Sequence, residues 1–187
     1  MPGFIVLEGL NGAGKSTLSK LLADRIGGIY ISTPPDSLLL LRPAMDGNAS
    51  LLSRYHYYML GNAIVSDQVR EMRKTKFVVC DRFVYSTIAR HSLLGLHIDH
   101  ETAIADIEVP DVNIFVNVSD ETERIGRIDG RGKRTKWDEL DADPTMREKY
   151  LAFFHSKGFT FLETSHLSVS ESMSGLMAEL AKQGVVG

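Results

Sequence analysis

The sequence predicts an α/β fold in which a five-stranded parallel sheet carries helices on both faces. Short, almost continuously apolar segments alternate with longer segments of helical spacing along the chain. Strands that alternate with helices form parallel sheets, and these strands are apolar throughout because both of their faces are buried. The length of 187 residues fits one domain, so we expect residues 1–187 to form a single unit.

The strands are predicted first, because each is a short apolar or β-branched run that ends at a turn signal. The five runs are residues 4–7, 29–31, 77–80, 113–118 and 159–162.

The helices are predicted from apolar spacing and from their start and stop residues. The clearest is residues 51–72, where one apolar stripe also contains the polar Asn62. Ser119 is expected to cap the helix that follows the fourth strand. The other predicted helices are residues 17–26, the segment that ends near 94, residues 100–108, a segment that ends near 154, and residues 170–182.

Composition restricts the class of protein. Lysine and arginine number 21 against 24 aspartates and glutamates, a net charge of −3 that argues against a dedicated nucleic-acid binder. The single cysteine, Cys80, excludes an intramolecular disulfide framework and favours a reducing, cytoplasmic location. The first residues lack the features of a signal peptide and no apolar run approaches a membrane span, so we expect no membrane partner.

The strongest motif is Gly9-x-x-x-x-Gly14-Lys15-Ser16, a complete Walker A match between a predicted strand and a predicted helix. Its glycines let the backbone wrap around phosphate oxygens, and the helix start adds N–H donors. We expect Lys15 to reach the β- and γ-phosphates and Ser16 to ligate Mg²⁺. An incidental Gly-rich turn is disfavoured by the strand–loop–helix context, while GTPase, ATPase and kinase all stay open. The expected nucleotide-binding residues are Asn11, Gly12, Ala13, Gly14, Lys15, Ser16 and Thr17.

Asp81 and Arg82 follow the third strand, at the end of a parallel sheet where ligands bind. A guanidinium can grip phosphate with two parallel hydrogen bonds, so Arg82 is predicted to hold an acceptor phosphate. A surface ion pair is the alternative. Asp81 is predicted to hold Mg²⁺ or to orient the acceptor, and a helix N-cap is the alternative role.

An arginine-rich stretch follows the fourth strand, with three glycines interspersed. A charge run is often a solvated face, but the glycines favour a lid, residues about 124–142, that closes over phosphates. Arg127 and Arg131 are predicted to stabilise transition-state charge. The charged residues in question are Arg124, Arg127, Arg131, Lys133 and Arg134.

These motifs together resemble the thymidylate kinase family. Residues 7–17 resemble its opening segment, Asp81-Arg82-Phe83 with Ser86 resembles its Asp-Arg-Tyr motif, and the arginine run to Arg131 resembles its lid. The resemblance covers nearly the whole chain. It implies a three-layer P-loop kinase core, ATP as donor, Mg²⁺, a pyrimidine nucleoside monophosphate as acceptor, and a homodimer.

A narrower resemblance points to the mitochondrial UMP-CMP kinase branch. It rests on residues 33–35, Arg42, Arg54, Tyr58 and Asn62, and it implies that Arg42 and Arg54 contact the acceptor phosphate. Tyr57, Tyr58 and Asn62 are expected to frame the acceptor base, because rings can stack on a base and an amide can read its edge. Solvated helix charges and core packing are the alternatives for these residues. Glu8 matches a glutamate that the family places beside the phosphate loop, for acceptor binding or for holding the loop.

Three positions depart from the family pattern, all on the acceptor side. Asn11 stands where relatives usually carry an acid, residues 33–36 replace an arginine-containing segment, and Ala63 lies where an acceptor-binding arginine is usual. These departures indicate an acceptor site that differs from the usual dTMP site.

Three functions are therefore carried forward. The first is ATP-dependent transfer to a pyrimidine (deoxy)nucleoside monophosphate. The second is a kinase for an unphosphorylated nucleoside or similar metabolite, which would need a general base such as Glu8 or Asp81. The third is a nucleotide-dependent switch or assembly factor.

Overall fold

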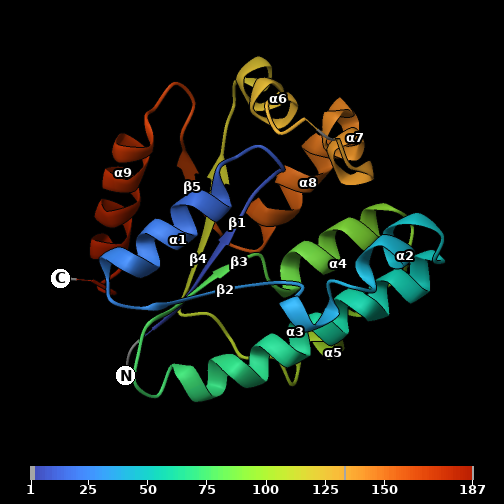
Figure 1. Cartoon of the computed structure of the whole chain (residues 1–187), viewed down its shortest axis with the longest axis horizontal. Coiled ribbons are helices and arrows are strands. Elements are labelled where there is room, and N and C mark those ends of the chain that lie inside the picture. Colours follow the sequence, from blue (N-terminus) through green and yellow to red (C-terminus); the bar gives the residue numbers. More distant parts are fainter. Residues whose placement is uncertain (1–2, 133, 187) are drawn as a thin grey trace.

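The computed structural model describes residues 3–132 and 134–186 and has the predicted α/β architecture (Figure 1). Its sheet has five strands in the order β2-β3-β1-β4-β5, and every neighbouring pair is parallel. Each observed strand overlaps its predicted run, with ends that move by at most one residue. The strands are β1 Phe4–Glu8, β2 Ile29–Ser32, β3 Val78–Asp81, β4 Val112–Asn117 and β5 Thr160–Glu163.

Helices connect these strands and cover both faces of the sheet. In the described part of the chain they are α1 Lys15–Arg25, α2 Arg42–Gly47, α3 Leu51–Met72, α4 Val84–Leu93, α5 His100–Ile104, α6 Glu121–Asp129, α7 Lys136–Ala142, α8 Pro144–Ser156 and α9 Val169–Lys182, with a short 3₁₀ helix at Asp36–Leu38.

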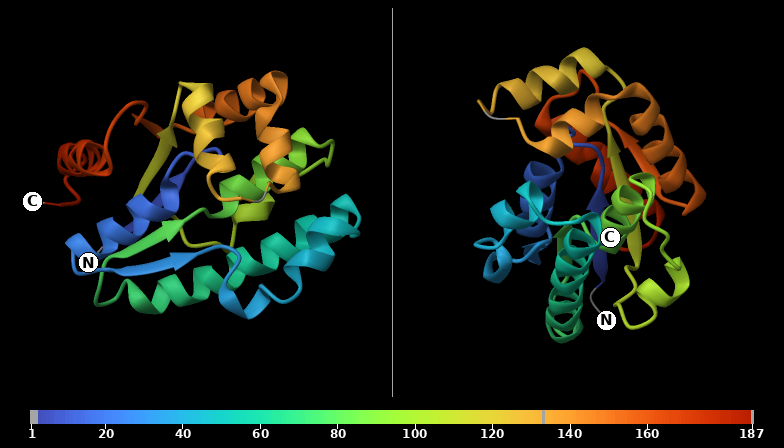
Figure 2. Two further views of the ribbon diagram at one scale, coloured as in Figure 1. Left: turned by 45° about the horizontal axis from the view of Figure 1, so that its top comes forward. Right: turned by 90° about the vertical axis from the view of Figure 1, so that its right-hand side faces the viewer.

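Two hydrophobic layers enclose the sheet. On one face, α1 and α9 bury residues such as Leu22 and Leu176 against Ile5 and Leu7 of β1. On the other face, α3, α4 and α8 pack against the sheet, as the two sides of Figure 1 and the turned views of Figure 2 illustrate. Because β1 is buried on both faces, its carboxyl end is fixed firmly, and the phosphate loop begins there.

The long helix α3 confirms the prediction for residues 51–72 at both ends. Ser50 caps it by accepting a hydrogen bond from the Ser53 N–H, which satisfies a donor that the first helical turn leaves unpaired. The buried stripe includes Val65 and Val69, as the spacing predicts.

Some local predictions were wrong. Asp120, not Ser119, caps α6: its carboxylate accepts the Glu123 N–H at 3.1 Å, whereas the Ser119 N–H donates to Glu163 on β5. Helices α2 and α7 were not predicted, because both are shorter than the window in which helical spacing can be recognised. Residue 133 of the predicted lid lies outside the described residues.

Within the described residues, no helix combines the length and the apolar character needed to cross a lipid bilayer.

Candidate functional site

The phosphate loop follows β1, and its shape depends on glycine. A Cβ added to Gly9, at φ 149°, would lie 2.3 Å from the Val116 carbonyl oxygen on β4. A Cβ on Gly12 would lie 2.7 Å from the Arg124 carbonyl oxygen of α6. Gly14 has the left-handed φ of 87° immediately before α1. The sequence therefore needs glycine at these positions to bring the loop against β4 and α6.

Lys15 lies buried beneath this loop. Its ammonium group donates to the Leu10 carbonyl oxygen at 2.7 Å. Burial, together with the positive charge of Arg82, lowers the pKa of Lys15 to about 7, while the carboxylate of Asp81 opposes the change. Lys15 and Arg82 line the same cleft, and two neighbouring basic side chains favour binding of an anion, as phosphoryl transfer requires.

Ser16 and Asp81 form a pair that suits a magnesium ion. The Ser16 hydroxyl donates to Asp81 Oδ2, and the other carboxylate oxygen, Oδ1, is buried without a partner among the described residues. Hydroxyl and carboxylate oxygens are the ligands that Mg²⁺ prefers, directly or through water. The pair thus fits the predicted metal role better than the alternative N-cap role, since α4 begins three residues later.

Arg82 is held at the turn between β3 and α4 in a left-handed conformation, with φ 66°. Its guanidinium donates to the Ser86 hydroxyl at 3.1 Å and to the Asn11 side-chain oxygen at 2.5 Å. A non-glycine residue adopts this backbone conformation at a cost, and such strain is concentrated at functional sites. The turn directs Arg82 back towards the phosphate loop.

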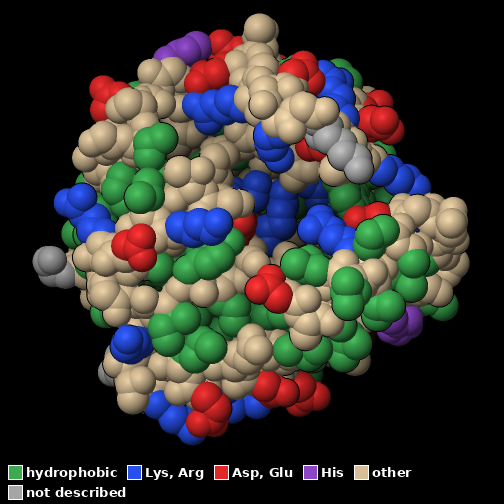
Figure 3. Space-filling model, viewed as in Figure 1, with side chains coloured by type: hydrophobic (Ala, Val, Ile, Leu, Met, Phe, Trp, Pro, Cys, Tyr) green, Lys and Arg blue, Asp and Glu red, His purple; other side chains and the backbone are tan. Residues whose placement is uncertain are grey.

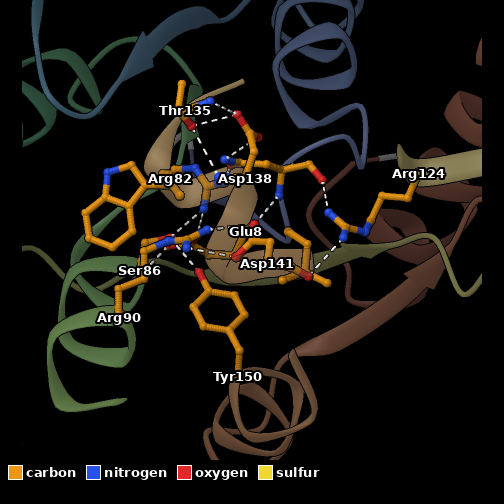
Figure 4. A network of polar contacts seen from close by, with 12 residues as sticks. Glu8, Arg82, Ser86, Arg90, Arg124, Thr135, Asp138, Asp141 and Tyr150 are labelled. Carbon is orange, nitrogen blue, oxygen red and sulfur yellow. Dashed lines mark hydrogen bonds and ion pairs between the residues drawn. The ribbon is translucent and has the colours of Figure 1, made fainter. Parts of the chain in front are cut away.

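Glu8 stabilises that turn. Its carboxylate accepts the backbone N–H groups of Phe83 at 2.9 Å and Ser86 at 3.2 Å. It also accepts the hydroxyl of Ser86, which lies beside Glu8 in Figure 4. Burial raises the pKa of Glu8, while Arg82 and these hydrogen bonds act against the rise. Of the two roles predicted for Glu8, the geometry matches the holding of a loop, because Glu8 is fully buried and borders neither cleft described below.

Two clefts open at the carboxyl ends of the strands, and they meet. The loop cleft, of about 470 Å³, runs along the phosphate loop. The helix cleft, of about 400 Å³, lies among α2, α3, α4 and α7. Figure 3 shows a hollow near the centre of this face with lysine and arginine side chains on its floor. The residues common to both clefts are Asn11, Ser16, Asp81, Arg82 and Arg131.

The residues predicted for the acceptor divide into two groups. Arg42 and Tyr58 line the helix cleft, where Asp46 binds both of their side chains. Arg54 and Asn62 do not line it.

Arg54 is buried and donates to the carbonyl oxygens of Met45 and Ala49, so it holds the α2–α3 connection. Asn62 is fully buried and donates to the Thr87 hydroxyl at 3.0 Å. Arg54 thus has its partners inside the protein, as its structural alternative requires, whereas the buried side-chain oxygen of Asn62 has no hydrogen-bond partner among the described residues.

The lid arginines also differ from one another. Arg131 borders both clefts and forms no side-chain hydrogen bond or ion pair with a described residue. Arg127 borders only the loop cleft, and Glu123 binds its guanidinium. Arg124 is fully buried and donates to the backbone oxygens of Asn11 at 2.6 Å and Asp141 at 3.0 Å.

Sequence reasoning missed several residues of the helix cleft. Trp137 and Asp138 of α7, with Arg90 and His91 of α4, all line it. One local signal was present: Thr135 and Asp138 form a reciprocal capping box, whose Thr-x-x-acid spacing is visible in the sequence. The position of Arg90 beside Asp141 has no such signal, since 51 residues separate them.

Comparison with known proteins places this site in a family. The family model described as thymidylate kinase matches residues 7–174. A probable thymidylate kinase of Methanococcus aeolicus is 27% identical over 198 residues, covering all of both chains, and a thymidylate kinase of Rickettsia typhi is 26% identical, covering 90% of this chain and 92% of its own. The crystal structure of thymidylate kinase from Ehrlichia chaffeensis shares the fold with a TM-score of 0.66 at 21% identity, covering 96% of this chain and 100% of its own. The structure of the Candida albicans enzyme has a TM-score of 0.75 at 15% identity, covering 98% and 93% of the two chains. The chain therefore belongs to the thymidylate kinase family.

Proposed function

We propose that this protein transfers the γ-phosphoryl group of ATP·Mg²⁺ to a pyrimidine nucleoside monophosphate, with dTMP as the first acceptor to test. One observation carries the proposal: two clefts meet at Asp81, Arg82 and Arg131. A triphosphate in the loop cleft and a second nucleotide in the helix cleft would place their phosphates at this junction. Phosphoryl transfer needs such positioning and charge neutralisation more than it needs covalent chemistry.

The roles follow from position. Lys15 would neutralise the β- and γ-phosphates, and Ser16 with Asp81 would hold Mg²⁺. Arg82 would grip the acceptor phosphate, and Arg131 would stabilise charge in the transition state, with Arg127 assisting from the donor side. Arg42 and Tyr58 would border the acceptor further along the helix cleft.

The arrangement favours a monophosphate over an unphosphorylated nucleoside. A nucleoside kinase needs a general base near the accepting hydroxyl. Glu8 is fully buried and bound to backbone N–H groups, and Asp81 is engaged by Ser16. Arg82 and Arg131, by contrast, face the junction and suit a second phosphate. A nucleotide-dependent switch would have no use for the second cleft.

Two narrower statements, a homodimer and a cytoplasmic location, stay proposals, whereas the narrower family resemblance does not. The resemblance to the mitochondrial UMP-CMP kinase branch is not supported by the family model or by the relatives described above, which are thymidylate kinases. A homodimer can be tested by light scattering. A cytoplasmic location, with neither nucleic acid nor membrane as partner, is in keeping with the net charge and single cysteine.

The test is ADP formation from ATP·Mg²⁺ across a panel of pyrimidine nucleosides and their monophosphates. We expect turnover that depends on a pyrimidine monophosphate, with dTMP among the substrates. Turnover with nucleosides alone would establish the second hypothesis. ATP hydrolysis that no acceptor stimulates would establish the third.

A further inference from the structure

Asn11 connects the phosphate loop to three distant segments. Its side-chain oxygen accepts from Arg82 at 2.5 Å, and its side-chain NH₂ donates to Asp138 Oδ1 of α7 at 2.9 Å. Its backbone N–H donates to Asp141 Oδ2 at 2.8 Å, and its backbone oxygen accepts from Arg124 of α6 at 2.6 Å. All four polar groups of one loop residue are therefore bonded to residues at least 71 positions away.

The two side-chain bonds require an amide. One end of the Asn11 side chain meets a guanidinium, which only donates, and the other meets a carboxylate, which only accepts when ionised. The reverse orientation of the amide would place NH₂ against Arg82 and oxygen against Asp138. An aspartate at position 11 would keep the bond to Arg82 but would set two carboxylates against each other.

Asp138 is ionised in this arrangement. Burial acts to raise its pKa, but hydrogen bonds from Thr135 and Asn11, together with the charge of Arg131, outweigh that effect and keep the pKa below its usual value. Its second oxygen, Oδ2, accepts from both the backbone N–H and the hydroxyl of Thr135 (Figure 4). The carboxylate therefore joins the start of α7 to the Asn11 amide.

We propose that the Asn11 side chain is a positioning residue that holds α7 on the phosphate loop and aims Arg82 into the junction of the two clefts. The attachment of α7 can be measured without any substrate, while the effect on phosphoryl transfer rests on the proposed function. Asn11 acts through Arg82 and α7 and carries out no chemical step itself.

A swap of the two polar groups tests this arrangement. Asn11→Asp places a carboxylate against the carboxylate of Asp138. In Asp138→Asn, the NH₂ group of the new amide must face a donor, either the Asn11 NH₂ or Thr135. In the double variant Asn11→Asp/Asp138→Asn, the new aspartate accepts from both Arg82 and the new amide, whose oxygen accepts from Thr135. The double variant thus has the same net charge and the same number of bonds as the native pair.

Trp137 supplies a direct measure of α7, because it is the only tryptophan and lies beside Asp138, buried. We expect acrylamide to quench the Trp137 fluorescence more strongly in Asn11→Asp than in the native protein. In the double variant, the quenching should return to the native level. The kcat/KM for the acceptor should fall at least about 10-fold in Asn11→Asp and recover in the double variant, since a buried bond to a charged partner is lost and regained. Glu139→Gln, an exposed carboxylate on the same helix, is the matched control and should leave both readouts unchanged.

Native quenching in Asn11→Asp, or a double variant no better than the worse single variant, would overturn the proposal. If Asn11→Asp does not fold, a folded double variant supports the arrangement and an unfolded one contradicts it. If the native protein transfers phosphate to no nucleotide, the proposed function fails, while the quenching series still decides the role of Asn11.

Discussion

Arg90 and Asp141 form a buried, bidentate ion pair with N···O distances of 2.8 and 3.0 Å, and this pair ties α4 to α7. The guanidinium also lies over the ring of Tyr150, which Figure 4 shows beside it, and over the ring of Trp137. Because Asp141 Oδ2 accepts the Asn11 N–H as well, the pair supports the phosphate loop from the side of the helix cleft.

Loss of one partner should therefore destabilise the fold. Asp141→Asn leaves the buried Arg90 uncompensated, and we expect the free energy of unfolding to fall by about 3–5 kcal/mol. Urea denaturation followed by circular dichroism measures the change. Asp143→Asn, a half-turn away and exposed, keeps a side-chain oxygen that can cap α8 and should change the free energy of unfolding by about 0.5 kcal/mol or less. Equal losses in the two variants would contradict a special role for the pair.

The same pair predicts a pH dependence. Burial acts to raise the pKa of Asp141, but the charge and hydrogen bonds of Arg90 and the Asn11 N–H outweigh it and hold the pKa below its usual value. A carboxylate with a lowered folded pKa contributes stability that is present above the unfolded pKa, about 3.9, and is lost as pH falls below it. Unfolding free energies measured from pH 6 to pH 2 should therefore fall more steeply in the native protein than in Asp141→Asn.

Gly9→Ala tests the fit of the phosphate loop against β4. The new methyl group would lie 2.3 Å from the Val116 carbonyl oxygen, so the loop must move, at a cost of about 2–4 kcal/mol. Thermal unfolding and ATP titration measure the loss of stability and of donor binding. Gly126→Ala is the control, because an added Cβ there meets nothing within 4 Å and the helical position should gain about 0.5–1 kcal/mol.

Lys15→Met should abolish phosphoryl transfer and leave the fold intact. The buried ammonium group is the cation of the phosphate loop, and methionine replaces its stem without its charge. Circular dichroism and the ADP assay separate the two effects. Transfer at the native rate in this variant would refute the assignment of the donor site.

Arg131→Ala should lower kcat about 100-fold or more while the KM for ATP changes little, because Arg131 borders both clefts and acts where charge develops. Arg127→Ala should have the smaller effect, since Arg127 is bound to Glu123 and borders the loop cleft alone. Arg134→Ala, whose exposed side chain pairs with Asp129, is the control and should be active. A kcat in Arg131→Ala equal to that of Arg134→Ala would contradict the role of Arg131 in stabilising transition-state charge.

Asp81→Asn should raise the Mg²⁺ concentration needed for half-maximal activity about 10-fold or more, because a neutral amide is a poorer partner for a hard cation than a carboxylate. Activity measured across a magnesium titration checks this. An unchanged titration midpoint would leave Asp81 as an orienting residue only.

Much of the donor site could be predicted because its residues are neighbours in sequence. The Walker A motif, the strand before it and the helix after it are contiguous, and hydrophobic periodicity placed α3 at its observed ends. The predicted α/β class and its parallel sheet follow from the same local alternation, although the strand order does not.

The acceptor side could be predicted only in part. Residue type suggested Arg42 and Arg54 alike, yet one lines the helix cleft and the other binds backbone carbonyl oxygens beneath it. Likewise the arginine run looked uniform, but Arg124 is buried and Arg131 is exposed. Which way each arginine faces depends on packing between elements, and sequence spacing within one helix does not report that packing.

The sequence by itself determined the phosphate loop, the alternating α/β pattern and the arginine-rich character of the lid, because each depends on local spacing and on residues adjacent in the chain. Only the tertiary structure decided that Asn11 meets Asp138, 127 residues away, and that Arg90 meets Asp141. Those contacts arise where the carboxyl ends of parallel strands bring separate loops together, and no local preference of the chain encodes which loop residues will face one another.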